Sequence, residues 1–478
     1  MLILFLLLWW QRDSKNVPPG PWGLPVVGVL PFLGRDPQLT MMQWAKRYGN
    51  VFSVRMGTKT AVILMNGYEA IREVFQKKGA DCSGRARMPT FGYLGGRGIL
   101  WSDASQTQRT QKEFAMKYLS KADIEFHTQK EIDALVQHIK DKNGEPFDFS
   151  CLISALASNI IGAILFGKRQ DYDDPDFIGL IDSYHNALDL SAQASIENCF
   201  PFLGFLPQCK RGRNAWRTFA NNFNWMMAHN RTGYRANATR GLADAFLHKS
   251  NLRGPDCQLL FSEDDTATNC RSLYFAGSET TSLTMTWGML FLLSNRDAIS
   301  KIQAEIDEMV GQERRPALAD RPKLPFTCAT LMEIQRCNYI SPFSLPHKAT
   351  NDVTANGHLI PKGTTILANH WSIFMNNELW GNPHAFQPER FLDECGRLKK
   401  IEQFIPFSVG PRSCPGEVLA RQELFLVFTA LLQGFSFRVP DGEALPDLHY
   451  PAPGMMIYLV TGKLPSNSES QGGSDDSM

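Results

Sequence analysis

The sequence predicts a mainly helical protein with small β-sheets. Two long apolar stretches, residues 149–166 and 273–293, contain no proline and are long enough to form buried helices. A third stretch, after Gly416, repeats leucine and phenylalanine at roughly helical spacing. Strand-like runs are fewer and shorter, and the clearest pair flanks Gly57.

The composition indicates a globular protein with a sizeable core. Of the 478 residues, 43% are hydrophobic and 20% are charged, and the net charge is +1. This charge gives no overall field that would attract nucleic acid, so no nucleic-acid partner is expected. The ten cysteines are scattered, without a CxxC pair or a His/Cys cluster at zinc spacing, which argues against a disulfide framework or a zinc site and favours a reducing cytosolic setting.

Both ends of the chain differ from its body. Residues 1–10 are wholly apolar, but ten helical residues reach only about 15 Å, half of a hydrocarbon core of about 30 Å. They are a short or truncated anchor, the apolar part of a signal peptide, or a segment dipping into one leaflet; an anchor is favoured because no small-residue cleavage site follows. Residues 11–25, polar and then proline-rich, predict a stiff hinge before the body at residues 26–465. The polar tail, residues 466–478, is predicted to be disordered.

Local patterns predict the elements of the body. Helices are expected at residues 37–48, 68–78, 106–119 and 149–166. Two strands are expected within residues 51–66, and Asn356-Gly357 marks a tight turn before a strand at 364–369. Residues 85–98 are a glycine-rich loop, and residues 200–265 are poorly periodic. Since residues 149–166 include several small and polar members, a buried core helix is expected there rather than a membrane span.

The longest predicted helix, residues 262–293, contains the hexapeptide AGSETT in its apolar part. Ser262 and Asp265 resemble a capping box at its start. An interior glycine costs about 1 kcal/mol relative to alanine, and polar side chains amid apolar residues are costly unless they are hydrogen-bonded. The functional interpretation is a groove, in which Gly277 lets a flat ligand approach while Glu279 and Thr280 supply a proton route. A distorted helix with no ligand is the alternative.

Cys414 lies within FSVGPRSCPG, on a tight loop bounded by glycine and proline. A helix is predicted just after it, so the thiol faces the positive end of a helix dipole, and Arg412 adds a positive charge. Both effects favour the thiolate, and a thiolate on a rigid loop suits a soft metal ligand, above all a haem iron. The alternative is a cysteine that merely fills the core, which is the more common situation for such a residue taken alone.

A pair of opposite charges lies further upstream. Glu333 and Arg336 share one face of a predicted helix, and the sequence PERF, which contains Arg390, follows them. An E-x-x-R pair alone is a weak signal, because most such pairs are solvated ion pairs.

Four ordered motifs together resemble the cytochrome P450 family: AGSETT, E-x-x-R, PERF, and the fit of residues 407–416 to F-x-x-G-x-R-x-C-x-G. The resemblance covers roughly residues 18–464. The stretches PPGPWGLP, LPHKAT and FGKR are most similar to the microsomal group, which includes vertebrate family 2 and steroid-hydroxylating relatives. The resemblance implies a cytochrome P450 fold, that is, a single mostly helical haem-binding domain with small β-sheets at one side.

The resemblance also implies roles for individual residues. Glu279 and Thr280 would deliver protons to dioxygen. A buried network behind the haem would consist of Glu333, Arg336 and Arg390. Residues expected around haem b are Cys414 as the iron ligand and, with it, Arg412, His347, Phe407, Lys112 and Gly277. Residues expected to line the substrate pocket are Phe275, Ala276, Phe343, Leu345 and Met455.

One pair of positions departs from the family. Relatives usually show W-x-x-x-R, whose indole and guanidinium hold a haem propionate, where this chain has Gln108 and Lys112. Lys112 can pair with a carboxylate but lacks the bidentate fork of arginine, and Gln108 can donate a hydrogen bond but cannot stack. We therefore hypothesise a less tightly held haem edge.

The implied reaction is insertion of one oxygen atom of O2 into a small hydrophobic substrate, with electrons from NADPH through a flavoprotein reductase. The expected partners are NADPH–cytochrome P450 reductase and, as a second candidate, cytochrome b5. The expected location is the endoplasmic reticulum membrane, with the catalytic domain facing the cytosol. Fatty acids, steroids and xenobiotics remain open as substrates. Candidates for the reductase-docking surface are Arg109, Lys117, Lys121 and Lys399.

Two other functions compete with this interpretation. One is a haem-thiolate isomerase or dehydratase that rearranges peroxides without a reductase; such relatives commonly lack the acid–alcohol pair, so Glu279 and Thr280 argue against it. The other is a non-catalytic haem protein, which the altered residues Gln108 and Lys112 keep open.

Overall fold

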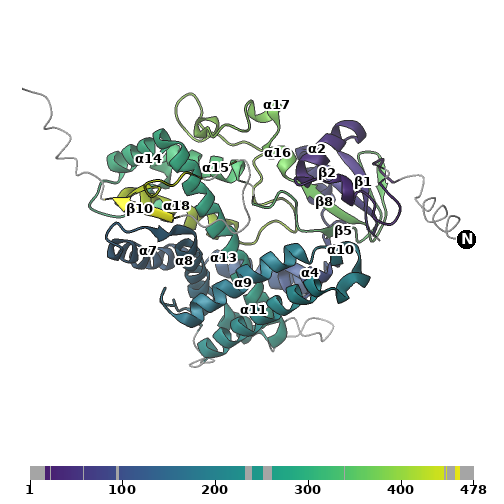
Figure 1. Cartoon of the computed structure of the whole chain (residues 1–478), viewed down its shortest axis with the longest axis horizontal. Coiled ribbons are helices and arrows are strands. Elements are labelled where there is room, and N and C mark those ends of the chain that lie inside the picture. Colours follow the sequence, from purple (N-terminus) through teal and green to yellow (C-terminus); the bar gives the residue numbers. More distant parts are fainter. Residues whose placement is uncertain are drawn as a thin grey trace, which may run out of the picture.

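The computed structural model describes residues 17–462 except 22, 58, 93–95, 232–238, 251–260, 339, 446–447 and 449–457. The predicted anchor at residues 1–10, the predicted tail at residues 466–478 and Met455 therefore lie outside the described residues. Figure 1 shows helices through most of the molecule, with β1, β2, β5 and β8 and the helix α2 at one side and β10 at the opposite side. This arrangement confirms the predicted mainly helical fold with small sheets.

The helical elements, including short 3₁₀ and π segments, are in chain order η1 Leu30–Phe32, α2 Pro37–Tyr48, α3 Tyr68–Ile71, η2 Arg72–Lys77, α4 Pro89–Gly92, α5 Gly98–Trp101, α6 Gln106–Leu119, α7 Ile124–Asp141, α8 Phe149–Phe166, α9 Pro175–Gln193, α10 Ile196–Cys199, η3 Pro201–Phe205, α11 Pro207–Arg231, α12 Leu242–Lys249, α13 Glu263–Ser294, α14 Arg296–Met309, η4 Leu318–Lys323, α15 Pro325–Cys337, α16 Trp371–Phe374, α17 Asn377–Trp380, η5 Pro388–Phe391 and α18 Glu417–Gly434. The strands are β1 Val51–Met56, β2 Lys59–Asn66, β3 Gly84–Arg85, β4 Phe147–Asp148, β5 His347–Lys348, β6 Val353–Ala355, β7 His358–Ile360, β8 Thr365–Asn369, β9 Ser436–Arg438 and β10 Tyr458–Gly462.

The largest sheet joins distant parts of the chain in the order β1-β2-β8-β5-β3. Its β1–β2 pair is antiparallel, from Val51 opposite Met65 to Met56 opposite Lys59, which confirms the two strands predicted around Gly57. The returning strand β8 lies parallel to β2. The proline-rich hinge lies along this sheet, because Ser53 donates hydrogen bonds from its N–H to the carbonyl of Pro19 and from its hydroxyl to that of Pro18. The strands β3 and β5 are neighbours in this sheet, and their residues Arg85 and His347 lie opposite one another.

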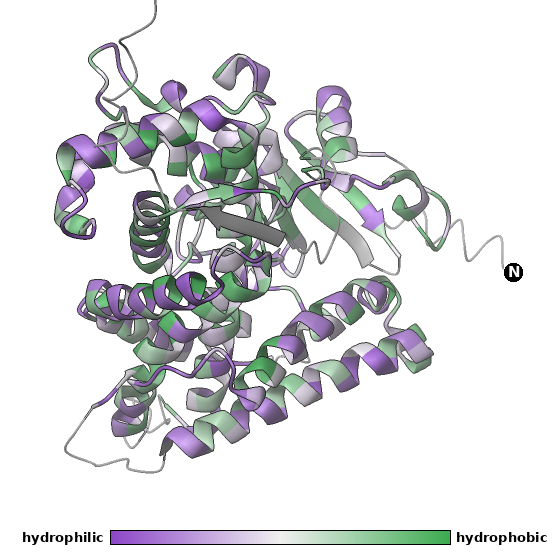
Figure 2. Cartoon of the chain, turned by 60° about the vertical axis from the view of Figure 1, so that its left-hand side comes forward, coloured by the Kyte–Doolittle hydropathy of each residue, from purple (hydrophilic) through white to green (hydrophobic). Residues whose placement is uncertain are grey.

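The helical core is built around α8 and α13, which pack against one another. Among the described residues, α8 is the one helix long and apolar enough to cross a membrane, and 89% of it is buried inside the protein, as expected for a core helix. At the start of α13, the Ser262 hydroxyl accepts from the N–H of Asp265, whose carboxylate accepts from the N–H of Ser262; this is the predicted capping box. Figure 2 shows that the outer helices alternate between hydrophilic and hydrophobic residues, as amphipathic helices do.

Helix α11 lies in the stretch for which the sequence pattern predicts no clear element. Its buried residues Trp216, Phe219 and Phe223 do recur at helical spacing, but many polar residues separate them. Tertiary contact supports this helix: α11 packs along α9, and Phe219 contacts Tyr184 of α9 edge-on. Together α9 and α11 form an outer layer in front of α13 (Figure 1).

Candidate active site

Cys414 is held on a tightly constrained loop, as predicted. Its N–H donates to the carbonyl of Phe407 at 3.0 Å. Gly410 has a φ of 82°, and a Cβ there would lie 1.7 Å from the carbonyl oxygen of Phe75, so only glycine fits this position. Helix α18 begins three residues after the cysteine. The Cys414 side chain is accessible, which leaves its sulfur open to a ligand partner.

The charge balance at the Cys414 thiol differs from the sequence-based expectation. Although the Cys414 side chain is accessible, the protein packed around it desolvates the thiol, which raises its pKa and outweighs the Gly416 N–H and Lys112, which act in the opposite direction. Arg412 does not face the sulfur, because its guanidinium donates to the carbonyls of Ser83, Ile99 and Ser102. The predicted lowering of the pKa by Arg412 was therefore wrong. A thiolate at Cys414 depends on a bound cation such as a metal ion for its stability.

Three basic side chains, which we call the cation group, lie near the Cys414 loop: Arg85, Lys112 and Arg412. Arg85 donates from its side chain to the carbonyls of Leu100 and Leu345. Lys112 donates to the carbonyls of Pro411 at 2.7 Å and Ser413 at 2.9 Å, on the Cys414 loop itself. In the described part of the chain, none of the three forms an ion pair with a carboxylate.

Burial weakens the protonated forms of all three side chains, and the charge of Arg412 adds to this at Arg85 and Lys112. Burial, with Arg412 next, lowers the pKa of Arg85 to about 9. Burial, with Arg412 as the next cause, lowers the pKa of Lys112 to about 8, and burial lowers the pKa of Arg412 to about 10. A buried cation without a counter-charge is costly. The cation group therefore has an excess of positive charge that a bound dianion, such as the two propionates of a haem, would neutralise.

The side chains of Gln108 and Arg412 share one backbone carbonyl as their acceptor. Its buried side chain donates from Nε2 to the carbonyl of Ile99 at 2.9 Å, and the same carbonyl accepts from Arg412 at 3.0 Å. Gln108 therefore helps to position α5 and Arg412, and its amide group is already engaged. Sequence reasoning named Lys112 as a candidate for binding a haem propionate but did not single out Arg85, which lies in a glycine-rich segment without periodicity.

His347 is buried next to the cation group. Its ring stacks on Phe75 with 4.1 Å between centroids, and its Nδ1 lies 2.8 Å from the carbonyl of Cys82. A carbonyl only accepts, so Nδ1 carries the proton and the neutral ring presents Nε2 as an acceptor. Burial, followed by the charges of Arg85 and Arg412, holds the pKa of His347 well below its usual range. His347 could donate to a carboxylate from Nε2 only as the imidazolium, which a bound anion favours.

Glu279 and Thr280 lie on α13, within the predicted hexapeptide. The Thr280 side chain is exposed although most of the helix is buried, and its hydroxyl donates to the carbonyl of Ala276 at 2.7 Å. Glu279 is mostly buried, and its Oε2 lies 3.3 Å from Nε2 of His185 on α9. The hexapeptide therefore combines an accessible hydroxyl, that of Thr280, with a carboxylate, that of Glu279, which lies within ion-pair distance of α9.

Two of the predicted contacts differ from the structure. A Cβ on Gly277 would approach the side chain of Ile161 on α8 to 3.1 Å, so this glycine serves the close packing of α8 and α13 rather than the approach of a flat ligand. The Phe343 ring packs on the apolar cluster of β1, β2 and α2, which makes it part of the sheet core. Both differences arise because a sequence motif does not show in which direction a side chain points.

The remaining predicted pocket residues that the structure describes are Phe275, Ala276 and Leu345. Phe275 joins the aromatic cluster of α9 and α11, 5.4 Å from Trp216 and 6.1 Å from Tyr184 between ring centroids. Ala276 and Leu345 are half-buried.

The Glu333 network has the predicted members. Arg336 donates to both carboxylate oxygens of Glu333, at 2.7 and 2.8 Å, and Arg390 donates to Oε1 at 3.0 Å. Glu333 and Arg336 are fully buried. The remaining N–H groups of the two arginines donate to backbone carbonyls, including those of Phe374 and Trp380. The Glu333 network, a structural brace, thus contains its own carboxylate counter-charge and is hydrogen-bonded within the protein.

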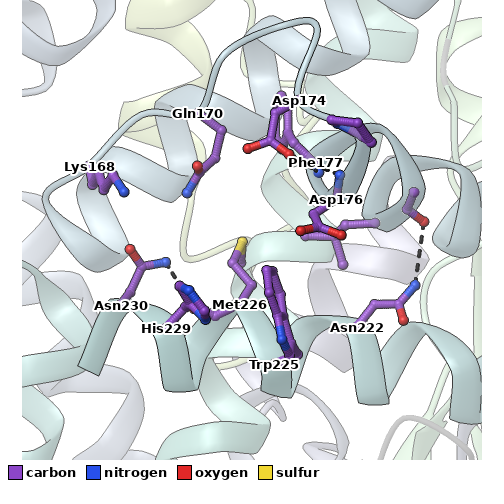
Figure 3. A pocket seen from close by; sticks show the side chains of 13 residues that line it. Lys168, Gln170, Asp174, Asp176, Phe177, Asn222, Trp225, Met226, His229 and Asn230 are labelled. Carbon is purple, nitrogen blue, oxygen red and sulfur yellow. Dashed lines mark hydrogen bonds between the residues drawn. The ribbon is translucent and has the colours of Figure 1, made fainter. Parts of the chain in front are cut away.

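A surface cavity of about 460 Å³ lies apart from these residues, between the start of α9 and the end of α11. Figure 3 shows Asp176, Trp225 and Met226 around it, with Lys168 and Gln170 on the segment that precedes α9. None of the predicted site residues lines this cavity.

Comparison with known proteins identifies the family. The cytochrome P450 family model matches residues 18–462. The chain belongs to the cytochrome P450 family. Cytochrome P450 2D3 of Rattus norvegicus is 34% identical over 467 residues, covering 94% of this chain and 92% of the relative. Cytochrome P450 2C3 of Oryctolagus cuniculus is 35% identical, covering 91% of each, and cytochrome P450 2J3 of Rattus norvegicus is 36% identical, covering 91% of this chain and 88% of the relative.

Family membership confirms the predicted class of function. This cytochrome P450 is a haem-thiolate monooxygenase that uses haem b, with electrons from NADPH through a reductase, and acts on a hydrophobic substrate. The residues present fit the cofactor, because an accessible thiol on a rigid loop lies close to a group of cations that, among the described residues, form no ion pair with a carboxylate. The rival interpretations, a peroxide isomerase and a non-catalytic haem protein, are not favoured.

Proposed function

We propose that the sulfur of Cys414 is the iron ligand and that Arg85, Lys112 and Arg412 bind the haem propionates. The observation that carries this proposal is the excess positive charge of the cation group beside an accessible thiol. Bound haem supplies the chemistry of dioxygen activation. The protein holds the cofactor, excludes water and supplies protons, and His347 as the imidazolium adds a further donor to the propionates.

We propose that Thr280 and Glu279 provide the protons that the reaction consumes. Thr280 presents an accessible hydroxyl that donates its hydrogen bond to the Ala276 carbonyl. Its oxygen can therefore accept a hydrogen bond from a proton-carrying group or a water. Glu279 carries a carboxylate one residue away on the same helix, and acid groups placed this way act as general acids. The apolar substrate would lie beside this face of α13, below the aromatic cluster that includes Phe275.

We propose NADPH–cytochrome P450 reductase as the electron donor and cytochrome b5 as a second partner. The four candidate docking residues Arg109, Lys117, Lys121 and Lys399 are all exposed. Three of them lie on or just after α6, the helix that also carries Lys112 to the Cys414 loop. A positive surface here would guide an acidic flavoprotein domain to the side of the molecule that holds the sulfur.

We propose that the protein lies on the endoplasmic reticulum membrane with its catalytic body in the cytosol. Supporting this are exposed apolar side chains on η3 and the N-terminal segment, Phe202, Phe205, Leu24 and Val26. These two segments meet at Gly57, whose N–H donates to the carbonyl of Val27 and whose backbone lies against the carbonyl of Cys199. Such an apolar surface is typical of a membrane contact.

The test is NADPH oxidation by the purified holoenzyme with reductase, with and without apolar compounds from the fatty-acid, steroid and xenobiotic classes. We expect at least one compound to accelerate NADPH oxidation and to emerge with one added oxygen atom. Rearrangement of an added peroxide without NADPH would instead favour the isomerase, and haem binding without either activity would favour a non-catalytic haem protein.

A further inference from the structure

The carboxylate of Glu279 has a partner on another helix. Its Oε2 lies 3.3 Å from Nε2 of His185 on α9, which is within ion-pair distance but without the geometry of a formed hydrogen bond. The Glu279 side chain is 21% exposed, whereas the His185 side chain is 40% exposed. Within the described residues, no lysine or arginine forms an ion pair with Glu279. The family motif predicts the acid, but nothing in the sequence around His185 indicates this contact.

His185 lies at the boundary between the two faces of α9. One face is exposed and includes Asp182, Asn186 and Asp189, and the other is buried and includes Tyr184 and Ala187. The ring of His185 also contacts the ring of Tyr184, with 4.4 Å between centroids. A side chain in this position reaches solvent on one side and the carboxylate on the other. An imidazole suits that position, because it gains and loses protons near neutral pH and has two nitrogens to do so.

Hydroxyl groups surround the inner end of this contact. Tyr184 of α9, Ser158 of α8 and both Tyr274 and Ser278 of α13 bury their oxygens, and none of these oxygens has a well-formed hydrogen bond within the described chain. Tyr184 and Tyr274 nevertheless lie close enough to Ser158 to influence one another. Burial raises the pKa of Tyr184, with Glu279 contributing, so that its hydroxyl stays neutral. Since buried hydroxyls are nearly always hydrogen-bonded, to protein or to water, we expect ordered water among these hydroxyls, and Tyr184 is the member that Glu279 influences electrostatically.

We propose that His185 is a positioning residue that holds the carboxylate of Glu279 and passes it protons from solvent. The proposal rests on the role assigned above to Glu279. Each turnover combines the substrate, O2, two electrons and two protons into a hydroxylated product and one water. His185 gives a proton from Nε2 to Oε2 of Glu279 and takes another from water, so that no reactant beyond NADPH, O2 and water is needed. Glu279 regains by this route each proton that it donates.

The test uses the holoenzyme with reductase, NADPH and O2 and no added substrate, so that it does not depend on knowing the substrate. Under these conditions O2 is reduced either by two electrons and two protons to hydrogen peroxide or by four of each to two waters. Formation of water takes two more electrons and two more protons than formation of peroxide. A slower supply of protons should therefore shift the products toward peroxide. The measured quantities are NADPH and O2 consumed and peroxide formed, in H2O and in D2O.

Three substitutions separate holding from relaying. His185→Gln keeps a side chain that can hydrogen-bond to Glu279 but cannot carry a proton, and we expect water formation to fall about tenfold, as is typical when a residue that supports a functional one is lost. His185→Lys supplies a proton-carrying cation, and we expect it to recover part of the loss. Asn186→Ala, on the exposed face next to His185, is the control and should match wild type. Water formation in His185→Gln equal to that of wild type, with the same solvent isotope effect, would overturn the proposal.

A second measurement does not depend on activity. A double-mutant cycle of His185→Gln and Glu279→Gln in urea unfolding should give a coupling between the two sites, and a cycle of Asn186→Ala with Glu279→Gln should give none. The same variants show which idea fails. If Glu279→Gln leaves water formation unchanged, the role of Glu279 is wrong; if Glu279→Gln lowers it and His185→Gln does not, only the role of His185 is wrong.

Discussion

The Glu333 network and the cation group are both clusters of buried or partly buried charge, but they are balanced in different ways. In the network, one fully buried carboxylate accepts from two arginines, whose other N–H groups reach backbone carbonyls. In the cation group, Arg85, Lys112 and Arg412 reach only carbonyls, and the pKa of each is lowered.

This difference separates a structural brace from a binding site. Each charge of the network has an opposite charge as a partner in the protein alone, so removing Glu333 leaves two arginines without a carboxylate. The cation group forms ion pairs only when an anion is bound. Removing one of its members from the haem-free protein therefore removes a charge that has no ion-pair partner among the described residues. In the haem-free protein, substitutions in the network should therefore lower the folding stability strongly, whereas substitutions in the cation group should change it little.

The largest effect is expected in the network. Glu333→Ala should cost about 3–5 kcal/mol of folding free energy, because it leaves two buried arginines without a carboxylate. Arg336→Ala should cost a similar amount, because it removes the two shorter hydrogen bonds to the buried Glu333 and leaves this carboxylate with Arg390 as its one arginine partner. We expect little soluble protein and no haem-loaded fraction, measured by yield, circular dichroism and haem content. Lys301→Met is the control, since it breaks the exposed pair of Lys301 with Glu389 and should cost less than about 1 kcal/mol. Folded, haem-loaded but inactive Glu333→Ala protein would contradict this account.

Arg85→Met should have the opposite pattern. Removing this cation should leave the stability of the haem-free protein within about 1 kcal/mol of wild type, because the lost hydrogen bonds to two carbonyls are offset by relief of repulsion. Haem should leave the variant about tenfold faster or more, since one charge-assisted contact to a propionate is lost. Urea unfolding and haem transfer to a haem acceptor protein measure the two quantities. A haem-free variant destabilised as strongly as Arg336→Ala would show that Arg85 is part of a brace.

The pH dependence of stability should distinguish the cation group in its free and bound forms. The pKa of Lys112 is about 8 in the folded protein and near 10.5 when exposed, so the unfolded chain binds more protons above pH 8. The haem-free protein should therefore gain stability as the pH rises from 8 toward 9, and Lys112→Met should reduce this gain. Urea unfolding at pH 7, 8 and 9 tests this. If wild type and Lys112→Met gained the same unfolding free energy between pH 8 and 9, a group other than Lys112 would be responsible for the pH dependence.

A smaller effect is expected for Lys112→Arg. Arginine supplies the bidentate fork that lysine lacks, so haem loss should slow by about threefold. Gln108→Trp should not add to this, because Gln108 is buried and a larger ring there would overpack the site. Unchanged haem loss in Lys112→Arg would remove the hypothesis that this chain holds its haem edge less tightly.

The sequence predicted the parts of the site whose spacing along the chain carries the information. The Cys414 loop, the capping box of α13 and the Glu333 network all follow from local motifs. Arg85 and His185 did not, because their contacts join residues that are far apart along the chain and neither belongs to a periodic pattern. Gly277 was misinterpreted because an interior glycine permits close approach by a ligand or by another helix, and the sequence does not distinguish the two.

The most direct test of the central claim is the ferrous–CO difference spectrum of the purified protein and of Cys414→Ser. A thiolate ligand pushes electron density onto the iron, which shifts the CO band to longer wavelength than a neutral ligand gives. We predict the red-shifted band in wild type and its loss in Cys414→Ser. Absence of that band in folded, haem-containing wild type, or its persistence in the variant, would contradict the assignment of Cys414 as the iron ligand.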